Sequence, residues 1–298
     1  MKELSELKDV VLNWKASPSS FGVLVLPEGG LTVPQERDLA YALSRPKPTD
    51  NQLNLIADLT AKKNAIPQLT EGAKTKLREI FVTLETSLKR EIKSKHLEKG
   101  IACEPDGLKM LQRTLEPHMM AVSDGQLYED DFLIGTPDKK VGKIVYDIKN
   151  TWDFMTLENA ELSKIYDWQG ICYLELLKNN KIEVDTFRLF YSLNTMPPYL
   201  MAKEFDIHYF QNPQYVTKDN PEYIQWCKDF EEAHTFDAIP DHKRFRMWET
   251  KYNPANTIRI QNTVIACREY LTQLLQEKAE RYIGNVELIK KAYESPVK

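Results

Sequence analysis

The sequence predicts a mixed α/β fold, in which a mixed sheet is flanked by helices. Several segments before residue 116 carry apolar residues at helical spacing. From His118 to Asn150, short apolar runs instead alternate with turn-forming residues, which is typical of strands. Residues 161–179 return to helical spacing, and the VDTFRLFYSL stretch after them is rich in aromatic and β-branched residues, as strands are. The resulting order, helix–β–β–β–helix–β, indicates one α/β core.

The elements are expected in the following order. A short amphipathic helix covers 1–15, a Pro/Gly/Ser-rich loop with a short strand covers 15–35, and one or two helices, interrupted near Pro46 and Pro48, cover 35–65. Two further helices run from Thr70 to about Lys95 and from about Leu97 to Leu115. A three-stranded meander follows, and the last third is mainly helical, with its longest periodic run at 257–283. No internal repeat or low-complexity linker is visible. We therefore expect a single domain, 1–298, with a helical N-terminal elaboration (1–95), a core (96–200) and a mostly helical C-terminal part (201–298).

Composition bounds the class of protein without defining it. The chain has 298 residues, of which 42% are hydrophobic, a formal net charge of −4 and a pI near 5.9. It is long enough for a large core, and its overall charge neither indicates nor excludes nucleic-acid binding, because local charge decides that. The four cysteines form no CxxC pair, so we expect free thiols and neither a zinc site nor an iron–sulfur cluster. No apolar run suggests a signal peptide or a membrane span, so we expect a cytoplasmic protein without a membrane partner.

A hairpin in the middle of the chain carries the most informative polar residues. Asp138 is expected to end one strand, and a turn containing Gly142 brings it beside the Asp147-Ile148-Lys149 strand. Because alternate residues of a strand share a face, Asp147 and Lys149 point to one side and Ile148 to the other. Two carboxylates can hold Mg²⁺, and a lysine beside them can orient a water molecule or stabilise developing charge. The alternative is a charged hairpin tip closed by a salt bridge, since Pro-Asp and acidic-x-Lys patterns also occur elsewhere in the chain.

Two helices supply further polar candidates. Glu104 lies within an apolar stripe of the helix before the meander, where a carboxylate needs a partner, and Gly100 one turn earlier allows close approach of a ligand or backbone. Gln169 lies on an otherwise apolar face with Tyr173 in the helix after the meander. The alternatives are a Glu salt-bridged to a core cation and a core Gln satisfied by backbone. The functional interpretation is a third acidic group beside a metal, and a polar group that holds Lys149 or a phosphate.

These four parts occur in an order that resembles a known superfamily. Gly100-x3-Glu104, Gly135-Thr-Pro-Asp138, Asp147-Ile-Lys149 and Gln169-x3-Tyr173 together resemble the PD-(D/E)xK nucleases, most closely the branch of RecB-type nuclease domains and phage lambda-type exonucleases. The resemblance covers residues 96–193 well and implies a restriction-endonuclease-like α/β/α core. It also implies site roles: Asp138, Asp147 and the Ile148 carbonyl as metal ligands, Glu104 binding the metal directly or through water, Lys149 positioning the attacking water, and Gln169 and Tyr173 supporting the lysine and phosphate.

The resemblance further implies a Mg²⁺-dependent deoxyribonuclease, with Mn²⁺ as a substitute, that acts on linear duplex DNA as a 5′→3′ exonuclease in phage-type recombination or repair. The alternatives are an endonuclease of the same superfamily and a catalytically silent DNA-binding or assembly subunit. The family suggests a homotrimeric ring, a single-strand annealing partner and the cytoplasm of a bacterium or phage-infected host.

Contacts to DNA are expected from basic residues outside the motifs. The N-terminal KASPSSFGVLV stretch loosely resembles the segment of the phage enzymes that meets the DNA end, so Lys15 and Ser17 are candidates for phosphate contacts. A basic stretch between Lys74 and Lys99, and Lys243, Arg244 and Arg246 next to Trp248, are candidates for a groove wall. The alternative for the Lys74–Lys99 stretch is a solvated helix face, because glutamates are interleaved with its basic residues.

Overall fold

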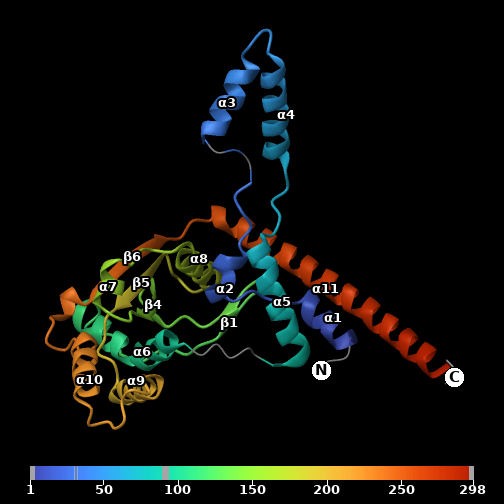
Figure 1. Ribbon diagram of the computed structural model, residues 1–298. Helices are drawn as coiled ribbons and strands as arrows, with labels where there is room; N and C mark the ends of the chain where they lie inside the picture. The colour runs from blue at the N-terminus through green and yellow to red at the C-terminus, as the bar shows by residue number, and fades with distance from the viewer. Residues whose placement is uncertain (1–3, 30, 32, 89–93, 295–298) are drawn as a thin grey trace. The chain divides into compact units, whose positions relative to one another are not determined.

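The structure is a computed structural model that describes residues 4–29, 31, 33–88 and 94–294. Its elements, in chain order, are α1 (Leu4–Leu12), α2 (Pro18–Leu24), α3 (Val33–Leu43), α4 (Asp50–Asn64), α5 (Glu71–Thr86), α6 (Lys95–Thr114), β1 (Tyr128–Glu129), β2 (Ile134–Gly135), β3 (Lys139–Val141), β4 (Ile144–Asn150), α7 (Phe154–Glu158), α8 (Lys164–Asn179), β5 (Thr186–Ser192), α9 (Pro198–Gln211), α10 (Pro221–Ala233), the 3-10 helix η1 (Asp241–Lys243), β6 (Phe245–Lys251) and α11 (Ala255–Glu294) (Figure 1). Among the described residues, no helix has the length and apolar character needed to span a bilayer.

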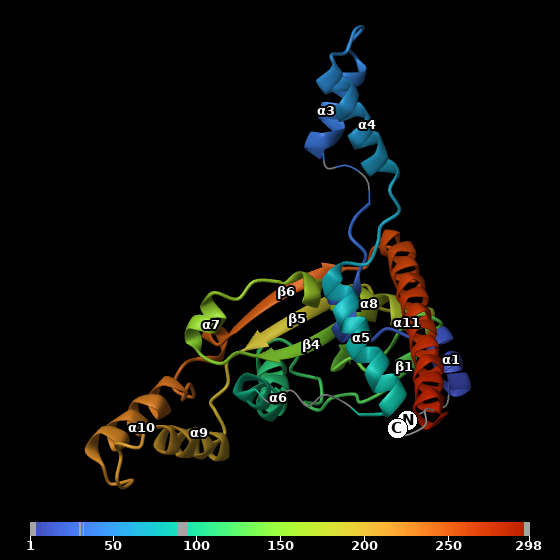
Figure 2. The ribbon, with the colours of Figure 1, turned by 45° about the vertical axis from the view of Figure 1, so that its right-hand side comes forward.

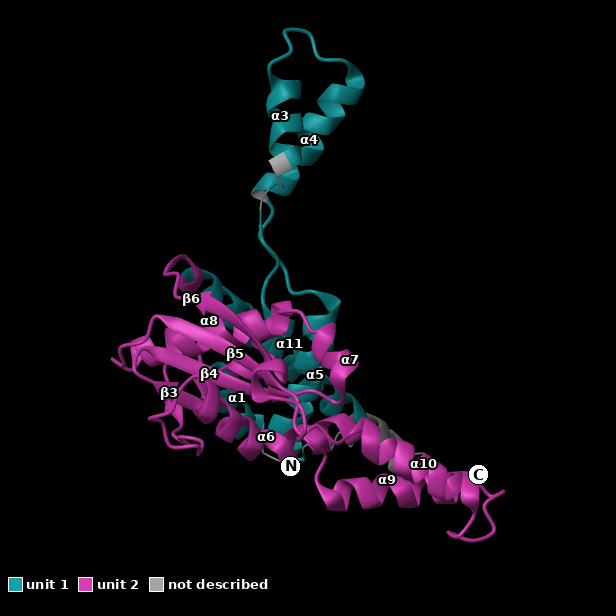
Figure 3. Cartoon of the chain, turned by 90° about the vertical axis from the view of Figure 1, so that its left-hand side faces the viewer, with its two compact units in different colours: residues 1–14, 23–88, 258–298 teal, residues 15–22, 89–257 magenta. Residues whose placement is uncertain are grey.

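The chain divides into two compact units, which are coloured separately in Figure 3. Unit 1 comprises residues 1–14, 23–88 and 258–298, and unit 2 comprises residues 15–22 and 89–257. Unit 2 contains the whole of the sheet and every motif of the predicted nuclease core. The interpretation of the chain as a single domain with a core at 96–200 stays a prediction.

The main sheet of unit 2 has the strand order β3-β4-β5-β6. β4 and β5 are parallel, and α8 forms the crossover that parallel neighbours require, whereas β3 and β6 pair antiparallel at the two edges. The register places Asp147 beside Leu189 and Lys149 beside Tyr191. A second small sheet consists of β1 and β2.

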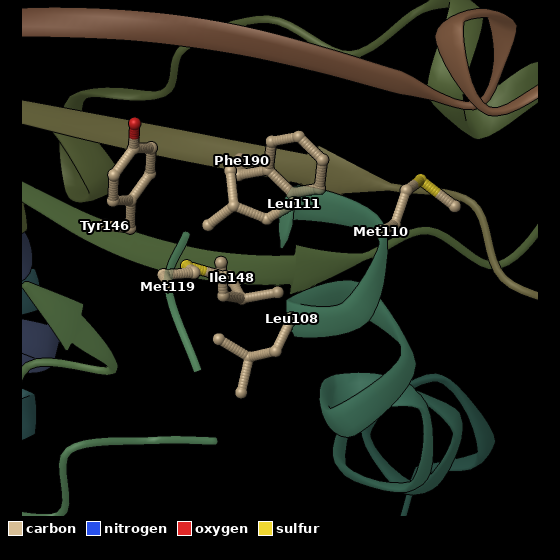
Figure 4. Close-up of a cluster of buried hydrophobic side chains, with 7 residues drawn as sticks. All are labelled: Leu108, Met110, Leu111, Met119, Tyr146, Ile148 and Phe190. Atoms are coloured by element: carbon tan, nitrogen blue, oxygen red, sulfur yellow. The ribbon is translucent and has the colours of Figure 1, made fainter. Parts of the chain in front are cut away.

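The two faces of this sheet are covered by different helices (Figure 2). Leu108 and Leu111 of α6 pack against Tyr146, Ile148 and Phe190 on one face (Figure 4). On the other face, residues of α8, among them Tyr173, Leu174 and Leu177, pack against Val145, Phe187 and Leu189. Ile148 therefore faces α6 and Asp147 faces α8, so the two residues lie on opposite faces of the sheet, as the sequence predicts.

Unit 1 is built from helices. Buried apolar residues of α11 recur every three or four positions and form one helix face: Ile260, Val264, Cys267, Leu271 and Leu275. Hydrogen bonds tie the N-terminal segments of this unit to α11: among them, the Leu26 N–H donates to Thr263 Oγ1 at 3.2 Å, and Arg268 Nε donates to the Trp14 carbonyl at 2.8 Å. The interruption predicted near Pro46 and Pro48 separates α3 from α4.

Three local predictions need correction. The 15–35 segment was expected to be loop with a strand, but it contains α2, which starts at Pro18 because proline suits the first helical position. The helix expected from Thr70 to Lys95 ends at Thr86, where Ser87 adopts a left-handed conformation (φ 59°) and its N–H donates to Thr83 O; residues 89–93 lie outside the described residues. The meander is two separate pairs, β1–β2 and β3–β4.

The buried face of α6 also differs from the predicted stripe. Leu97 and Ile101 are 48% and 64% exposed, whereas Lys99 and Cys103 are buried. Beyond Glu104 the prediction is correct, because Leu108 and Leu111 are buried. In the first half of α6, the apolar residues used for the prediction thus lie on the solvent side, and Lys99 and Cys103 form the buried side.

Substitution of the two glycines of α6 by alanine is expected to change stability in opposite directions. A Cβ at Gly107 would lie 2.7 Å from Ile148 Cγ2 and 3.0 Å from Ser192 Oγ, whereas a Cβ at Gly100 would meet nothing within 4 Å. We expect Gly107→Ala to lower the free energy of unfolding by about 1–3 kcal/mol through overpacking. Gly100→Ala is expected to raise it by about 0.5–1 kcal/mol, because alanine is the better helix former. Urea unfolding of both variants measures this, and equal effects of the two would contradict the close approach of α6 to the sheet at Gly107.

Candidate active site

The hairpin of β3 and β4 brings Asp138 next to the Asp147-Ile148-Lys149 strand. Asp138 lies directly before β3 and does not end the preceding strand as predicted, since β2 stops at Gly135. Gly142 makes the turn with a φ of +57°, a conformation that favours glycine. The Ile148 N–H donates to Asp138 Oδ2 at 2.7 Å, beyond the last backbone pair of β3. Asp138 is therefore fixed against β4 by a backbone hydrogen bond.

Asp147 is the most deeply buried charged group of this hairpin, with 1% of its surface exposed. Gln169 Nε2 donates to its Oδ1 at 2.7 Å, and Lys149 Nζ lies 2.5 Å from its Oδ2. The lysine contact is an ion pair by distance only, because Oδ2 has no well-directed hydrogen-bond donor among the described residues. One oxygen of a buried carboxylate is thus left facing a cation without a directed bond.

The acidic groups raise one another's proton affinity. Burial, together with the charges of Asp138 and Glu104, raises the pKa of Asp147 to about 7 against the opposing effect of Lys149. Burial also raises the pKa of Asp138, and burial followed by the charge of Asp138 raises that of Glu104. These carboxylates therefore repel one another at neutral pH, and a cation between them would relieve that repulsion.

Two tyrosines of α8 complete the surroundings of the hairpin. The Tyr173 hydroxyl donates to the Thr136 carbonyl at 2.9 Å, which holds the loop that carries Asp138. Its predicted contact with Lys149 is made instead by Tyr166, whose ring centroid lies 5.6 Å from Lys149 Nζ. Gln169 likewise binds Asp147 and not the lysine as proposed from the sequence.

The donor set fits a hard divalent cation. Asp138 and Asp147 offer carboxylate oxygens, and Asp147 Oδ2 is the buried atom without a directed partner. Because the N–H and C=O of a strand residue point to the same edge, the Ile148 carbonyl faces the edge that carries Asp138. Among the described residues, no three acidic, histidine or cysteine side chains form a ready-made ligand cluster. A Mg²⁺ ion does not require such a cluster, because one or two carboxylates can hold it while water supplies the other ligands.

The DNA-contact candidates divide into groups with different surroundings. Ala16, between Lys15 and Ser17, pairs with Leu133, and Pro18 packs against Gly135, so this segment lies along the loop that leads to Asp138. Lys15 pairs with Glu129 at 3.2 Å, and Ser17 Oγ lies 2.8 Å from Ser19 Oγ.

The second basic cluster is only partly available to a ligand. Lys243 is exposed, and Arg246 pairs with Glu158 at 2.7 Å with 39% of its side chain exposed. Arg244 is 8% exposed and bound to Asp241, which removes it from the surface.

The basic stretch from Lys74 to Lys99 does not form one groove wall. It is divided between α5 and α6, which belong to different units, and Lys89, Arg90 and Lys93 lie outside the described residues. Lys99 is buried and donates to the Trp152 carbonyl at 2.6 Å. Burial lowers its pKa to about 8.

A polar network behind Lys149 escaped the sequence analysis. Ser192 Oγ donates to the Lys149 carbonyl at 3.2 Å and to Asn150 Oδ1 at 2.8 Å, and Asn194 Nδ2 donates to Asn150 Oδ1. Asn150 Nδ2 donates in turn to the Gly100 carbonyl on α6. The available signal was the change from apolar to polar residues at the carboxyl ends of β4 and β5.

Comparisons with known proteins agree with this architecture. No protein-family model and no curated protein matches the sequence. Among solved structures, a phage-related exonuclease from Haemophilus somnus 129PT matches with a TM-score of 0.56 and 19% identity, over 89% of this chain and 97% of that chain. An alkaline exonuclease from Laribacter hongkongensis, LHK-Exo, gives 0.49 and 12%, and its complex with dAMP gives 0.47 and 12%, each over 95% of this chain and 99% of that chain.

The chain therefore has a mixed α/β fold with a central sheet flanked by helices, as the sequence predicts. More particularly, its fold is that of the phage-related exonuclease, which confirms at the level of fold the resemblance found from the four motifs.

Gln169 tests whether Asp147 depends on a directed partner. Gln169→Leu leaves Asp147 Oδ1 buried without a donor, so we expect the free energy of unfolding to fall by about 1–3 kcal/mol. In the Asp147→Leu background, the same change is expected to cost much less, because no carboxylate remains to be satisfied. Urea unfolding of the four proteins gives the coupling, and an equal cost of Gln169→Leu in both backgrounds contradicts it.

Proposed function

We propose that the chain is a Mg²⁺-dependent deoxyribonuclease that degrades linear duplex DNA, as a 5′→3′ exonuclease. The observation that carries this proposal is the array of Asp138, Asp147, Lys149 and Gln169 on adjacent elements of a fold shared with a phage-related exonuclease. Mn²⁺ is expected to substitute for Mg²⁺. Recombination or repair in phage, a trimeric ring, a single-strand annealing partner and a cytoplasmic location remain predictions of the motif resemblance.

Each residue of the array has a physical role in hydrolysis. A bound divalent cation supplies polarisation of the phosphate and activation of water. Asp138 and Asp147, with the Ile148 carbonyl, hold that cation, while Glu104 adds negative charge to the same site. Lys149, with 29% of its side chain exposed, is accessible for orienting a water molecule or a phosphate oxygen. Gln169 keeps the Asp147 carboxylate in one orientation through Oδ1, which leaves Oδ2 for the cation.

Two other functions compete with this proposal. An endonuclease would use the same array but would cut closed circular DNA, which an exonuclease leaves intact. A catalytically silent DNA-binding or assembly subunit would keep the fold without the chemistry. The hydrogen bonds that fix Asp138 and Asp147 favour catalysis over the silent subunit, because placing two further carboxylates next to the buried Asp147 has no structural benefit.

The nuclease activity is tested by substitution of Lys149. We expect Lys149→Met to lower the rate of hydrolysis of linear duplex DNA with Mg²⁺ at least about 100-fold. The methionine can neither stabilise the charge that develops on the phosphate nor orient the attacking water. The matched control is Lys251→Met, because Glu249-x-Lys251 repeats the acidic-x-Lys pattern on β6, where Lys251 is 66% exposed and pairs with Glu249 at 2.9 Å.

The control is expected to keep wild-type activity. Equal hydrolysis by the Lys149 and Lys251 variants would overturn the mechanism. Absence of hydrolysis in the wild type would support the silent subunit, and cutting of closed circular DNA would support the endonuclease.

Metal binding is tested by calorimetry with Mg²⁺ and Mn²⁺. Asp138→Asn keeps an oxygen that accepts from the Ile148 N–H but removes the charge, so we expect binding to weaken about tenfold or more. The matched control is Asp106→Asn, which also follows a proline but lies on α6 with 51% of its side chain exposed and pairs with Lys109. Unchanged cation affinity in Asp138→Asn would remove this residue from the ligand set.

A further inference from the structure

An open hollow of about 440 Å³ lies in unit 2 beside the candidate active site. It is lined by Tyr166 of α8, by Tyr191 of β5, and by residues between Asp153 and Ser163 that include part of α7. α7 lies beyond the carboxyl end of β5 (Figure 2). The volume falls in the range of small-molecule sites.

The hollow is continuous with Lys149 through two contacts. Tyr191 is the register partner of Lys149 on the neighbouring parallel strand, so the two side chains leave the same face of the sheet next to each other. Tyr166, on the helix that covers this face, places its ring centroid 5.6 Å from Lys149 Nζ. A ligand in the hollow is therefore separated from Lys149 by no more than one tyrosine side chain.

The aromatic floor of the hollow is held in place by its neighbours. The Tyr166 and Tyr191 ring centroids are 6.3 Å apart with the planes at 57°, and Trp248 meets Tyr191 edge-on at 6.0 Å. Both tyrosines remain partly exposed, and Met155 on the rim is 68% exposed. A flat ligand that stacks on one of these rings therefore meets the other at an angle, and both rings are already in position.

Charge excludes a phosphate from the hollow itself. Asp153 and Glu161 line it, and no lysine or arginine is among the described residues that do so. The cations lie on either side of Tyr191 in the same row of the sheet: Lys149 on β4 and Arg246 on β6. Neighbouring strands are about 4.8 Å apart, so this row places an uncharged aromatic side chain between two cationic ones.

We propose that this hollow holds one nucleobase of the DNA strand whose phosphodiester bond lies at Lys149. The base stacks on the Tyr191 ring and meets the tilted Tyr166 ring beside it, and its backbone phosphates face Lys149 and Arg246. Because every base presents a π-face, such a site holds the strand without selecting its sequence. This inference rests on the proposed nuclease function, and it adds a binding position for the base to the groups that hold the phosphate.

The test removes either the base or the ring. Linear duplexes that lack one base at the first, second or third nucleotide of the hydrolysed strand are compared with the intact duplex. Hydrolysis is measured as kcat/KM with Mg²⁺, and affinity is measured with Ca²⁺ in place of Mg²⁺. We expect the wild type to lose about 5- to 100-fold in kcat/KM and in affinity at one of these positions. Tyr191→Leu is expected to lose a similar factor on intact DNA and to lose nothing more when that base is missing.

Two controls separate stacking from folding. Tyr191→Phe keeps the ring and is expected to behave as the wild type. Tyr199→Leu, on an exposed tyrosine of α9, is expected to change neither rate nor affinity. The subsite is overturned if the losses from Tyr191→Leu and from base removal multiply. It is also overturned if the wild type shows no loss for any missing base. In both cases intact DNA is still hydrolysed, so the nuclease proposal is not affected. Base-dependent affinity without hydrolysis of any duplex supports the subsite and overturns the nuclease proposal.

Discussion

The structure of unit 2 depends on the burial of one carboxylate, that of Asp147, next to two others. Burial and the charges of Asp138 and Glu104 oppose its ionisation, whereas Gln169 and Lys149 favour it. Such a group lowers stability unless its partners are fixed, because an uncompensated buried charge is among the costliest features of a fold. The surrounding elements supply those partners: α8 carries Gln169, the β3–β4 turn brings Asp138 to the Ile148 N–H, and β4 itself carries Lys149.

Close packing of the two helices makes these contacts possible. Gly170 follows Gln169, and a Cβ there would lie 2.1 Å from Phe187 Cδ1, so a larger residue would push α8 away from the sheet. On the other face, Gly107 allows α6 to approach Ile148 and Ser192 in the same way. Gly107 brings α6 to the carboxyl end of β4 and β5, where the polar residues lie, and Gly170 brings α8 to the amino end of β5 at Phe187. The geometry of the polar site is therefore set by packing on both faces of the sheet.

Much of this core could be predicted from local patterns. The alternation in IVYDIKN placed Asp147 and Ile148 on opposite faces, and the helical spacing of Gln169 and Tyr173 placed both toward the sheet. What failed depended on distant contacts. Leu97 and Ile101 were expected to be buried, but the chain packs Lys99 and Cys103 instead, and spacing alone cannot choose between two faces of a helix. The partners of Gln169 and Tyr173, and the network of Asn150, Ser192 and Asn194, require knowledge of which strands are neighbours.

The basic residues proposed to meet DNA all belong to a chain with a net charge of −4, and their present partners distinguish them. Lys15 and Arg246 form ion pairs with glutamates that are 60% and 50% exposed, and exposed pairs of this kind contribute about 0–1 kcal/mol. A phosphate can replace such a partner at little cost, so these residues stay available to a polyanion. Arg244 is different, because its side chain is only 8% exposed and is bound to Asp241. Removal of Asp241 from this pair would leave the charge of a buried guanidinium uncompensated. The contribution of Arg244 is therefore to fix the segment between η1 and β6, from which Arg246 extends toward the face that carries Lys149 and Tyr191.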